Sequence, residues 1–427
     1  MTGTAELAAT PEQRRFTDWN GKVMQRRIAK RYAAERRFRI VGLSAILLSA
    51  SFLAFLLISM LVQGLPGFTQ TEIKLPIDFK SSTLMIDPAL LKGQDADAAL
   101  ASADFEGATS AAADAAFGED GARLLSDGAW LKVQSAVREN PDILNGKADI
   151  WVPASVNIDL AAKGKGAAEG EKQLAKLKQS DAIKTGLNTG FLTGADATDP
   201  TLVGIWGALK GSLITMAITI LLAFPIGVFS AVYLEEYAPR NRWTDLIEVS
   251  INNLAAVPSI IFGLLGLAVF LNFMHLPRSA PIVGGLTLAL MTMPVIVIAG
   301  RNAIKSVPPS IRDAALGIGA SRVQVVFHHV LPLALPGILT GTIIGMARAL
   351  GETAPLLMIG MRAFISSAPT GITAPATVLP VQVFLWSDEV SKGFVEKTSA
   401  AIIVLLVFLL AMNGLAIYLR NKFETRW

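Results

Sequence analysis

The chain has 427 residues, no cysteine, 52% hydrophobic residues and 17% charged residues, with a mean hydropathy of +0.49. Soluble proteins carry about 25% charged residues on average, so these values exclude a mainly soluble protein and indicate several membrane spans. The absence of cysteine excludes a disulfide scaffold and thiolate chemistry. With three histidines in the whole chain, we predict neither catalytic residues nor a metal site.

The first apolar segment is preceded by a basic one. Residues 1–39 contain 10 Lys/Arg and 4 Asp/Glu, a net charge of +6, and the uncharged run Ile40–Val62 follows directly. A helix of that length crosses a hydrocarbon core about 30 Å thick. We therefore predict a basic cytoplasmic tail over 1–39 and a first transmembrane helix over 40–63, because Lys and Arg favour the cytoplasmic side. A nucleic-acid-binding arm is the weaker interpretation, since a span follows at once, and no nucleic acid partner is expected.

Five further apolar runs predict a total of six transmembrane helices. Alternation from a cytoplasmic N-terminus places the arginine-bearing loops 235–249 and 301–332 and the C-terminus in the cytoplasm, as the positive-inside rule requires. We therefore expect an all-α, multi-pass protein of the bacterial inner membrane with both termini cytoplasmic. The five runs are Gly211–Leu234, Ile251–Met274, Pro281–Gly300, Leu333–Met361 and Ala400–Leu419.

A segment of domain size separates the first two runs. Residues 64–200 contain 13 Lys/Arg and 20 Asp/Glu, a net charge of −7, and are expected on the extracytoplasmic side as an insert domain. The alternating stretch Glu72–Phe79 predicts a strand. Alanine-rich sequence over 96–116 favours helix or loose structure, and residues 163–184 favour a solvated helix or linker. Large apolar residues that could anchor a core are sparse in the insert. A spacer or assembly domain is the favoured interpretation, and a docking platform for an external partner the alternative.

The loop 301–332 contains two potential capping boxes, in which a serine and a residue three positions later exchange hydrogen bonds with each other's backbone. Ser310 with Asp313 predicts one short helix after Pro308-Pro309, ended by Gly317 and Gly319, since glycine tolerates positive φ. Ser321 with Gln324 predicts a second, limited by Pro332. Because both ends are tethered to the membrane, this helical knob is better suited to dock on a cytoplasmic protein than on DNA.

The same loop resembles a known family. Asp313-Ala314-Ala315, then Gly319 and Leu331-Pro332, is similar to the EAA loop of ABC importer permeases, with Asp313 in place of the usual Glu. The stretches 257–263, 348–355 and 379–383 further resemble the PstA family of phosphate permeases, in an extended variant with an N-terminal span and a large insert. The resemblance covers about 205–425. It implies coupling to an ATPase through Ser310, Asp313, Ala314, Ala315, Gly319, Leu331 and Pro332.

The resemblance also implies a type I (MetI-like) permease core over 201–427 that imports inorganic phosphate by alternating access. Its implied partners are a second homologous permease, two ATP-binding cassette ATPase subunits and a periplasmic phosphate-binding protein. The chain contains no Gly-x-x-x-x-Gly-Lys-Ser/Thr loop. We therefore expect a transporter subunit that is not an enzyme, with ATP and Mg on the partner ATPase. A permease for sulfate or molybdate, and a membrane receptor sensing a ligand through 64–200, are the alternatives.

One apolar run contains two charges, Arg348 and Glu352, which lie four residues apart and so can pair on one helix face. A lone arginine at the bilayer centre costs about 2.5–3.5 kcal/mol, so the pair should face protein or water. Arginine suits an oxyanion because its planar fork donates two parallel bonds. We interpret Arg348 as a phosphate contact held by Glu352, with a salt bridge that only locks helices as the alternative.

Other residues of the predicted path are polar or small. The helix-packing glycines Gly337, Gly341 and Gly345 continue at helical spacing toward Arg348, and this stripe is expected to face the path and a partner subunit's helices. Polar side chains beside a span broken at Pro258, or within the Arg348 motif, complete the prediction. These are Asn252, Asn253, Ser259 and Thr353.

Overall fold

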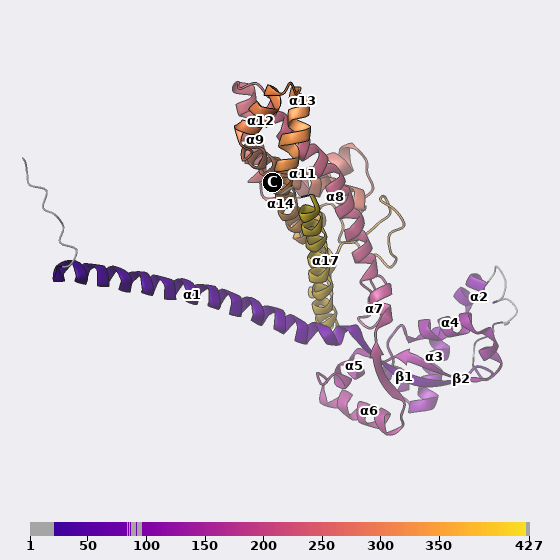
Figure 1. Cartoon of the computed structure of the whole chain (residues 1–427). Coiled ribbons are helices and arrows are strands. Elements are labelled where there is room, and N and C mark those ends of the chain that lie inside the picture. The colour runs from indigo at the N-terminus through magenta and orange to yellow at the C-terminus, as the bar shows by residue number, and fades with distance from the viewer. Residues whose placement is uncertain (1–20, 83, 85, 87–90, 92–95, 424–427) are drawn as a thin grey trace, which may run out of the picture. The chain divides into compact units, whose positions relative to one another are not determined.

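The computed structural model describes residues 21–82, 84, 86, 91 and 96–423 and divides the chain into two compact units, Met1–Ser59 and Met60–Trp427. The first unit contains most of helix α1, Lys22–Gly64 (Figure 1). At 1.5 Å per residue, its 43 residues are about twice as long as a hydrocarbon core is thick. The described part of the predicted basic tail is therefore helical and continuous with the first span, whose apolar side chains are exposed as lipid contact requires.

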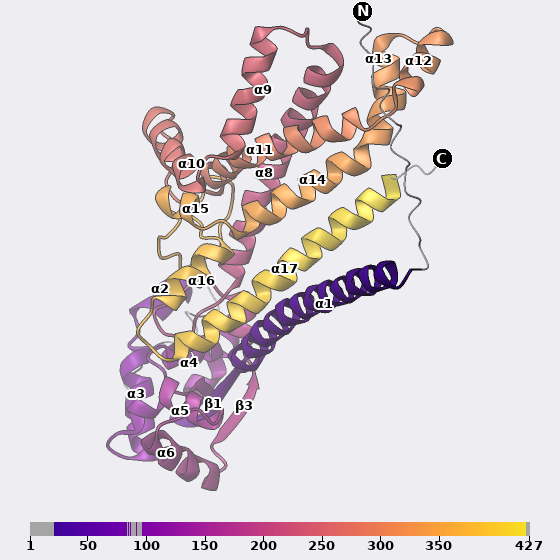
Figure 2. The ribbon, with the colours of Figure 1, turned by 90° about the vertical axis from the view of Figure 1, so that its left-hand side faces the viewer.

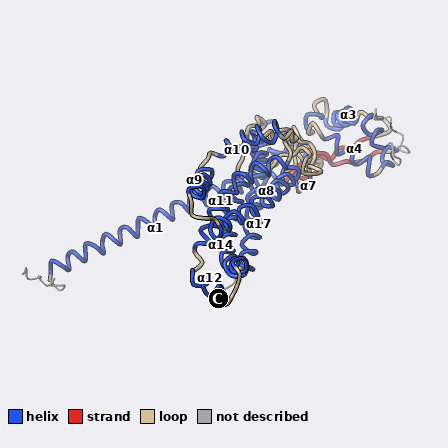
Figure 3. The backbone as a smooth tube through the Cα atoms, turned by 90° about the horizontal axis from the view of Figure 1, so that it is seen from above, coloured by secondary structure: helices blue, strands red, loops and turns tan. Residues whose placement is uncertain are grey.

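The insert contains a three-stranded antiparallel sheet in the order β2-β1-β3 (strands red in Figure 3). Its central strand β1, Thr69–Asp78, pairs with β2, Lys147–Pro153, and β3, Ile183–Leu187. Ile73, Leu75 and Ile77 alternate with more exposed residues, because successive strand side chains point to opposite faces. The predicted strand over 72–79 is confirmed, but it begins three residues earlier and ends one residue earlier, at Asp78.

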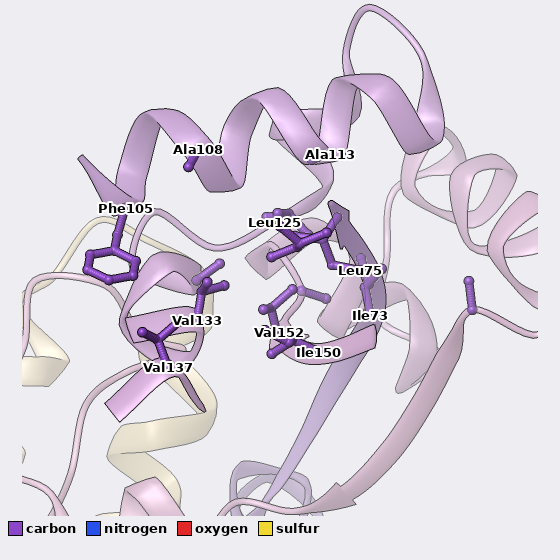
Figure 4. Close-up of a cluster of buried hydrophobic side chains, with 14 of the residues drawn as sticks. Ile73, Leu75, Phe105, Ala108, Ala113, Leu125, Val133, Val137, Ile150 and Val152 are labelled. Atoms are coloured by element: carbon purple, nitrogen blue, oxygen red, sulfur yellow. The ribbon is translucent and has the colours of Figure 1, made fainter. Parts of the chain in front are cut away.

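Helices enclose this sheet in a hydrophobic core of its own. Figure 4 shows Phe105, Val133 and Val137 turned toward Leu75 and Val152 on the strands. The prediction of sparse apolar anchors was wrong, because leucine, isoleucine, valine and phenylalanine side chains from the strands and helices form most of this core. The helices are α2 Ala96–Ser102, α3 Phe105–Phe117, α4 Ala129–Glu139, α5 Val156–Ala162, α6 Ala168–Gln179 and α7 Thr189–Thr193.

The segment after the insert is a helical bundle. Pairs of neighbouring positions show that α8, Trp206–Val232, and α11, Pro281–Lys305, run parallel: Gly285 lies against Ile218, and Gly300 against Ala231. Since both helices run in one direction, the chain recrosses between them, which gives six crossings in the described chain together with α1. The remaining long helices are α14 Leu331–Gly351 and α17 Gly393–Phe423, with the shorter α16 Leu379–Ser387 between them (Figure 2).

The recrossing segment is bent, and the predicted break of this span at Pro258 is confirmed. Helix α9, Arg242–Ala255, meets α10, Ser259–Gly266, at 101°, and a π-helical segment, Leu267–Phe273, extends α10. Pro258 lies at the bend and begins α10. Proline disfavours helical backbone in the residue before it and has no N–H for the helix.

The predicted span 333–361 was also too long. Helix α14 ends at Gly351, Glu352 is extended (φ −79°, ψ 122°), and the short α15, Ala354–Met358, follows. At its other end, α14 begins before Pro332. The proline therefore does not end the preceding helix as predicted, because a residue in the first helical turn needs no N–H donor.

The three glycines of α14 provide close packing on α11 of the same chain, a contact that the sequence analysis did not predict. A Cβ added at Gly337 would lie 2.7 Å from Ala303 Cβ, and one at Gly345 would lie 3.0 Å from Thr292 Cγ2. A Cβ at Gly341 would overlap Ala299. Small residues thus let the two antiparallel helices approach closely, as is common in membranes.

Replacing Gly341 by Ala is therefore expected to destabilise the bundle by about 1–3 kcal/mol, because the added methyl overpacks the helix pair. The matched control is Gly414→Ala in α17, where nothing lies within 4 Å and alanine is the better helix former. Thermal unfolding in detergent compares the two variants. Equal melting temperatures would contradict the packing described here.

Candidate coupling surface and substrate path

Two short helices project beyond the end of α11: α12, Pro309–Gly317, and α13, Arg322–Gln324. The second capping box is confirmed, since Ser321 N–H donates to Gln324 Oε1 at 2.9 Å and Gln324 N–H to Ser321 Oγ at 3.4 Å. The first is wrong, because the N-cap of α12 is Pro308, two residues before Ser310, and no side chain caps the helix. Gly319, at φ +90°, makes the turn between the helices as predicted.

This two-helix knob, residues 309–330, has a buried side and an exposed apolar side. Ala315 is buried with valines of the π-helical segment Val325–Val330, which continues into α14. Leu316 is 47% exposed, Ile318 83% and Val323 56%. Of the other predicted coupling residues, Ser310, Asp313, Ala314 and Gly319 are exposed and Leu331 and Pro332 half-buried. Exposed apolar side chains on a small rigid projection suit docking on another protein.

Ion pairs attach the knob to the bundle. The Arg312 guanidinium donates to Glu236 Oε1 at 2.7 and 3.1 Å, and to the backbone carbonyls of Val307 at 2.7 Å and Ile304 at 3.0 Å. One residue away, Glu235 accepts from Arg301, a residue of α11.

Both acids lie in the π-helical segment Tyr233–Tyr237 that ends α8. Arg301 also pairs with Glu248 of α9 at 2.8 Å. Because α11 extends to Lys305, Arg301 lies in a helix, and the predicted loop 301–332 begins later. Sequence analysis missed the acidic partners. The available signal was two adjacent acidic residues, Glu235 and Glu236, directly after an apolar run and on the same predicted side of the membrane as the basic loop 301–332.

Replacing Arg312 by Gln should loosen the knob, because Glu236 keeps a half-buried charge without its bidentate partner. We expect faster hydrogen–deuterium exchange over 309–330 and little change elsewhere. The control Arg322→Gln changes an exposed arginine of the same knob. Identical exchange in the two variants would contradict the role of the Arg312–Glu236 pair.

The predicted charge pair lies at the end of α14 and not within a continuous span: Arg348 is in its last turn and Glu352 is the first residue after it. Arg348 Nε is 3.4 Å from Glu352 Oε1, and the two side chains are 48% and 19% exposed. Arg348 shares the exposed face of α14 with Gly337, Ile344 and Gly351. Arg348 thus lies on nearly the same side of α14 as Gly341, since seven residues make almost two full turns, and it follows the closest glycine contacts with α11.

The other predicted path residues are not all brought to this face. Asn252 and Asn253 are exposed on α9, which packs on α11. Ser259 begins α10, which packs on α15, and Thr353 immediately precedes α15. Of these four residues, Ser259 and Thr353 therefore lie at the starts of α10 and α15, two helices that pack on each other.

A small cavity lies inside the bundle, lined by Ser212, Thr215, Leu288 and Ala349 among others. Its volume is about 10 Å³, which suits one water molecule and not a phosphate ion. Thr215 Oγ1 is buried and has no hydrogen-bond partner among the described residues. A water there would satisfy it, whereas a phosphate would need the exposed side of α14.

Two family models match parts of this chain. Residues 223–425 match the family described as binding-protein-dependent transport system inner membrane component, and residues 25–172 match a domain of unknown function, DUF3333. A MetNI methionine ABC transporter structure in an inward-facing conformation is 18% identical, with a TM-score of 0.42, over 52% of this chain and 98% of that one.

Two relatives are more similar in sequence. The probable ABC transporter permease YqgI of Bacillus subtilis is 33% identical over 239 residues, 51% of this chain and 80% of that protein. The phosphate transport system permease PstA of Yersinia pestis is 30% identical over 215 residues, 50% of this chain and 71% of that protein.

The helical bundle and the family match define a multi-pass membrane subunit of the ABC importer permease class, a transporter component. More particularly, the chain belongs to the PstA-like permeases of phosphate transport systems. The family resemblance drawn from 257–263, 313–332, 348–355 and 379–383 is therefore confirmed.

Proposed function

We propose that this chain is a permease subunit through which an ATP-driven importer moves inorganic phosphate across the bacterial inner membrane by alternating access. The knob over 309–330 carries the proposal. It is a rigid, partly apolar projection joined by Arg312 and Glu236 to the end of α8, so a force on the knob reaches the spans. Two ATPase subunits that bind ATP and Mg are the proposed source of that force, with N- and C-termini on the same, cytoplasmic side.

Phosphate is the proposed substrate because of Arg348. Its guanidinium is half exposed on α14, and its 3.4 Å distance from Glu352 leaves its donors accessible. A planar guanidinium binds a tetrahedral oxyanion through two parallel hydrogen bonds. The exposed face around Arg348 would be covered by a second, homologous permease subunit, and an extracytoplasmic phosphate-binding protein would deliver the ion. The names of the relatives support phosphate over sulfate or molybdate.

A receptor that senses a ligand through the insert is the alternative from another class. Among the described residues, five crossings follow the insert, and ion pairs fix the knob between α11 and α14 to the end of α8. A receptor that only signals through the membrane has no need of this arrangement, which supports transport instead.

The direct test is uptake into lipid vesicles that contain this chain with its second permease and ATPase subunits, supplied with phosphate-loaded binding protein. Arg348→Gln should reduce phosphate uptake at least about 100-fold, since loss of a preformed charged contact costs several kcal/mol, while the ATPase still copurifies. The control Arg240→Gln, an exposed arginine between α8 and α9 and outside the knob, should transport phosphate at the wild-type rate.

Near-normal phosphate uptake by Arg348→Gln would overturn its role. Uptake of sulfate or molybdate in preference to phosphate by the wild-type assembly would overturn the substrate. Absence of any copurifying ATPase would favour the receptor.

A further inference from the structure

Buried charges join the insert to the last span. Lys163, at the end of α5, lies 2.6 Å from Asp159 Oδ2 and 3.1 Å from Glu396 Oε2, and Glu396 belongs to the first turn of α17. Lys165 completes the pairing at 3.0 Å from Glu396 Oε1. The Lys163 and Glu396 side chains are each only 5% exposed.

Neutral groups from the connection between α1 and the sheet surround these ions. Lys163 Nζ donates to the Thr69 carbonyl at 3.1 Å, and the Thr71 N–H donates to Asp159 Oδ1 at 2.9 Å. Lys397, 4% exposed, donates to the Gly67 carbonyl at 2.8 Å and lies 5.1 Å from the centre of the Phe191 ring. We call the five charged residues the joint cluster: Asp159, Lys163, Lys165, Glu396 and Lys397.

The backbone approaches closely at the same place. A Cβ added at Gly67 would lie 2.7 Å from the Glu396 carbonyl oxygen, and one at Gly393 would lie 2.7 Å from Pro200 Cγ. A separate contact lies nearby, where Trp386 Nε1–H of α16 donates to Asp196 Oδ1 at 2.8 Å, in the segment between insert and α8. Burial raises the pKa of Asp196, and the hydrogen bond from Trp386 opposes this shift.

Such an arrangement is sensitive to movement. Buried ions are costly to desolvate, and their attraction compensates only when geometry and hydrogen bonding are good. Because Lys163 bridges a carboxylate of the insert and one of α17, any sliding between the two elements leaves buried charges without partners. The joint cluster therefore favours one position of the insert on α17 over neighbouring positions.

From this we infer that the insert and the first turns of α17 form one rigid body that moves together during transport, so that the joint cluster transmits force on the insert to the spans. This inference rests on the proposed function for its transport cycle. Helix α17 packs on α14, which carries Arg348, and on α16. A partner that binds the insert would thus act on the span next to the proposed phosphate contact.

The absence of native cysteine allows a direct test by spin labels at introduced cysteines. Lys172→Cys, exposed on α6, is paired with Val390→Cys, 97% exposed just before α17. A second pair joins Lys172→Cys to Met274→Cys, 51% exposed before α11. In the assembled transporter in lipid, the first distance should be narrow and identical without and with ATP, while the second should change. A first distance that shifts with ATP would overturn the inference.

The role of the ions is tested with Glu396→Gln, which should broaden the first distance and lower phosphate uptake by about tenfold, within the range typical of coupled sites. Glu396→Asp keeps the charge but is too short to reach both lysines, and it should broaden the distance less. The control Asp97→Asn breaks an exposed ion pair with Arg138, 2.8 Å long, elsewhere in the insert and should change neither quantity.

An unbroadened distance in both Glu396 variants would overturn the role of the joint cluster. If the wild-type assembly takes up no phosphate while the first distance stays narrow, the proposed function fails and the rigid joint stands.

Discussion

A charge removed from water must be paired, and this constraint fixes both ends of the helical bundle. At one end, Lys163 and Glu396 join the insert to α17. At the other, Arg312 and Glu236 join the knob to α8. Each pair links segments far apart in the sequence. The insert and the knob, the two parts that would contact partner proteins during transport, are thus each held to the bundle by ion pairs whose charges are costly to remove from water.

Between these ends the bundle is held by close packing. Gly341 and Gly345 let α14 lie against α11, and Arg348 is exposed about one turn beyond Gly345. A movement of α11 or α17 would therefore shift the Arg348 face directly. The broken span at Pro258 places α10 against α15, which begins just after Glu352. The proposed phosphate contact thus lies where several helix ends meet.

The sequence predicted the features that depend on long averages or on complete local motifs. Hydropathy over about 20 residues located the crossings, and the Ser321 capping box located α13. Sequence analysis failed where a single residue determines the local structure. Glu352 ends a helix inside an apolar run that hydropathy alone describes as continuous, whereas the break at Pro258 was predicted from the proline itself. The Lys163–Glu396 pair spans 233 positions, and no local pattern identifies such a contact.

Hydrogen–deuterium exchange of the Thr71 amide, which donates to the buried Asp159 carboxylate, tests the structural importance of the joint most directly. In the assembled transporter in lipid, Glu396→Gln leaves Lys163 with one of its two carboxylates. We expect Thr71 and its neighbours in β1 to exchange at least about tenfold faster, which corresponds to about 1.4 kcal/mol of lost local stability. Unchanged exchange in β1 would show that the buried charges do not hold the insert to the last span.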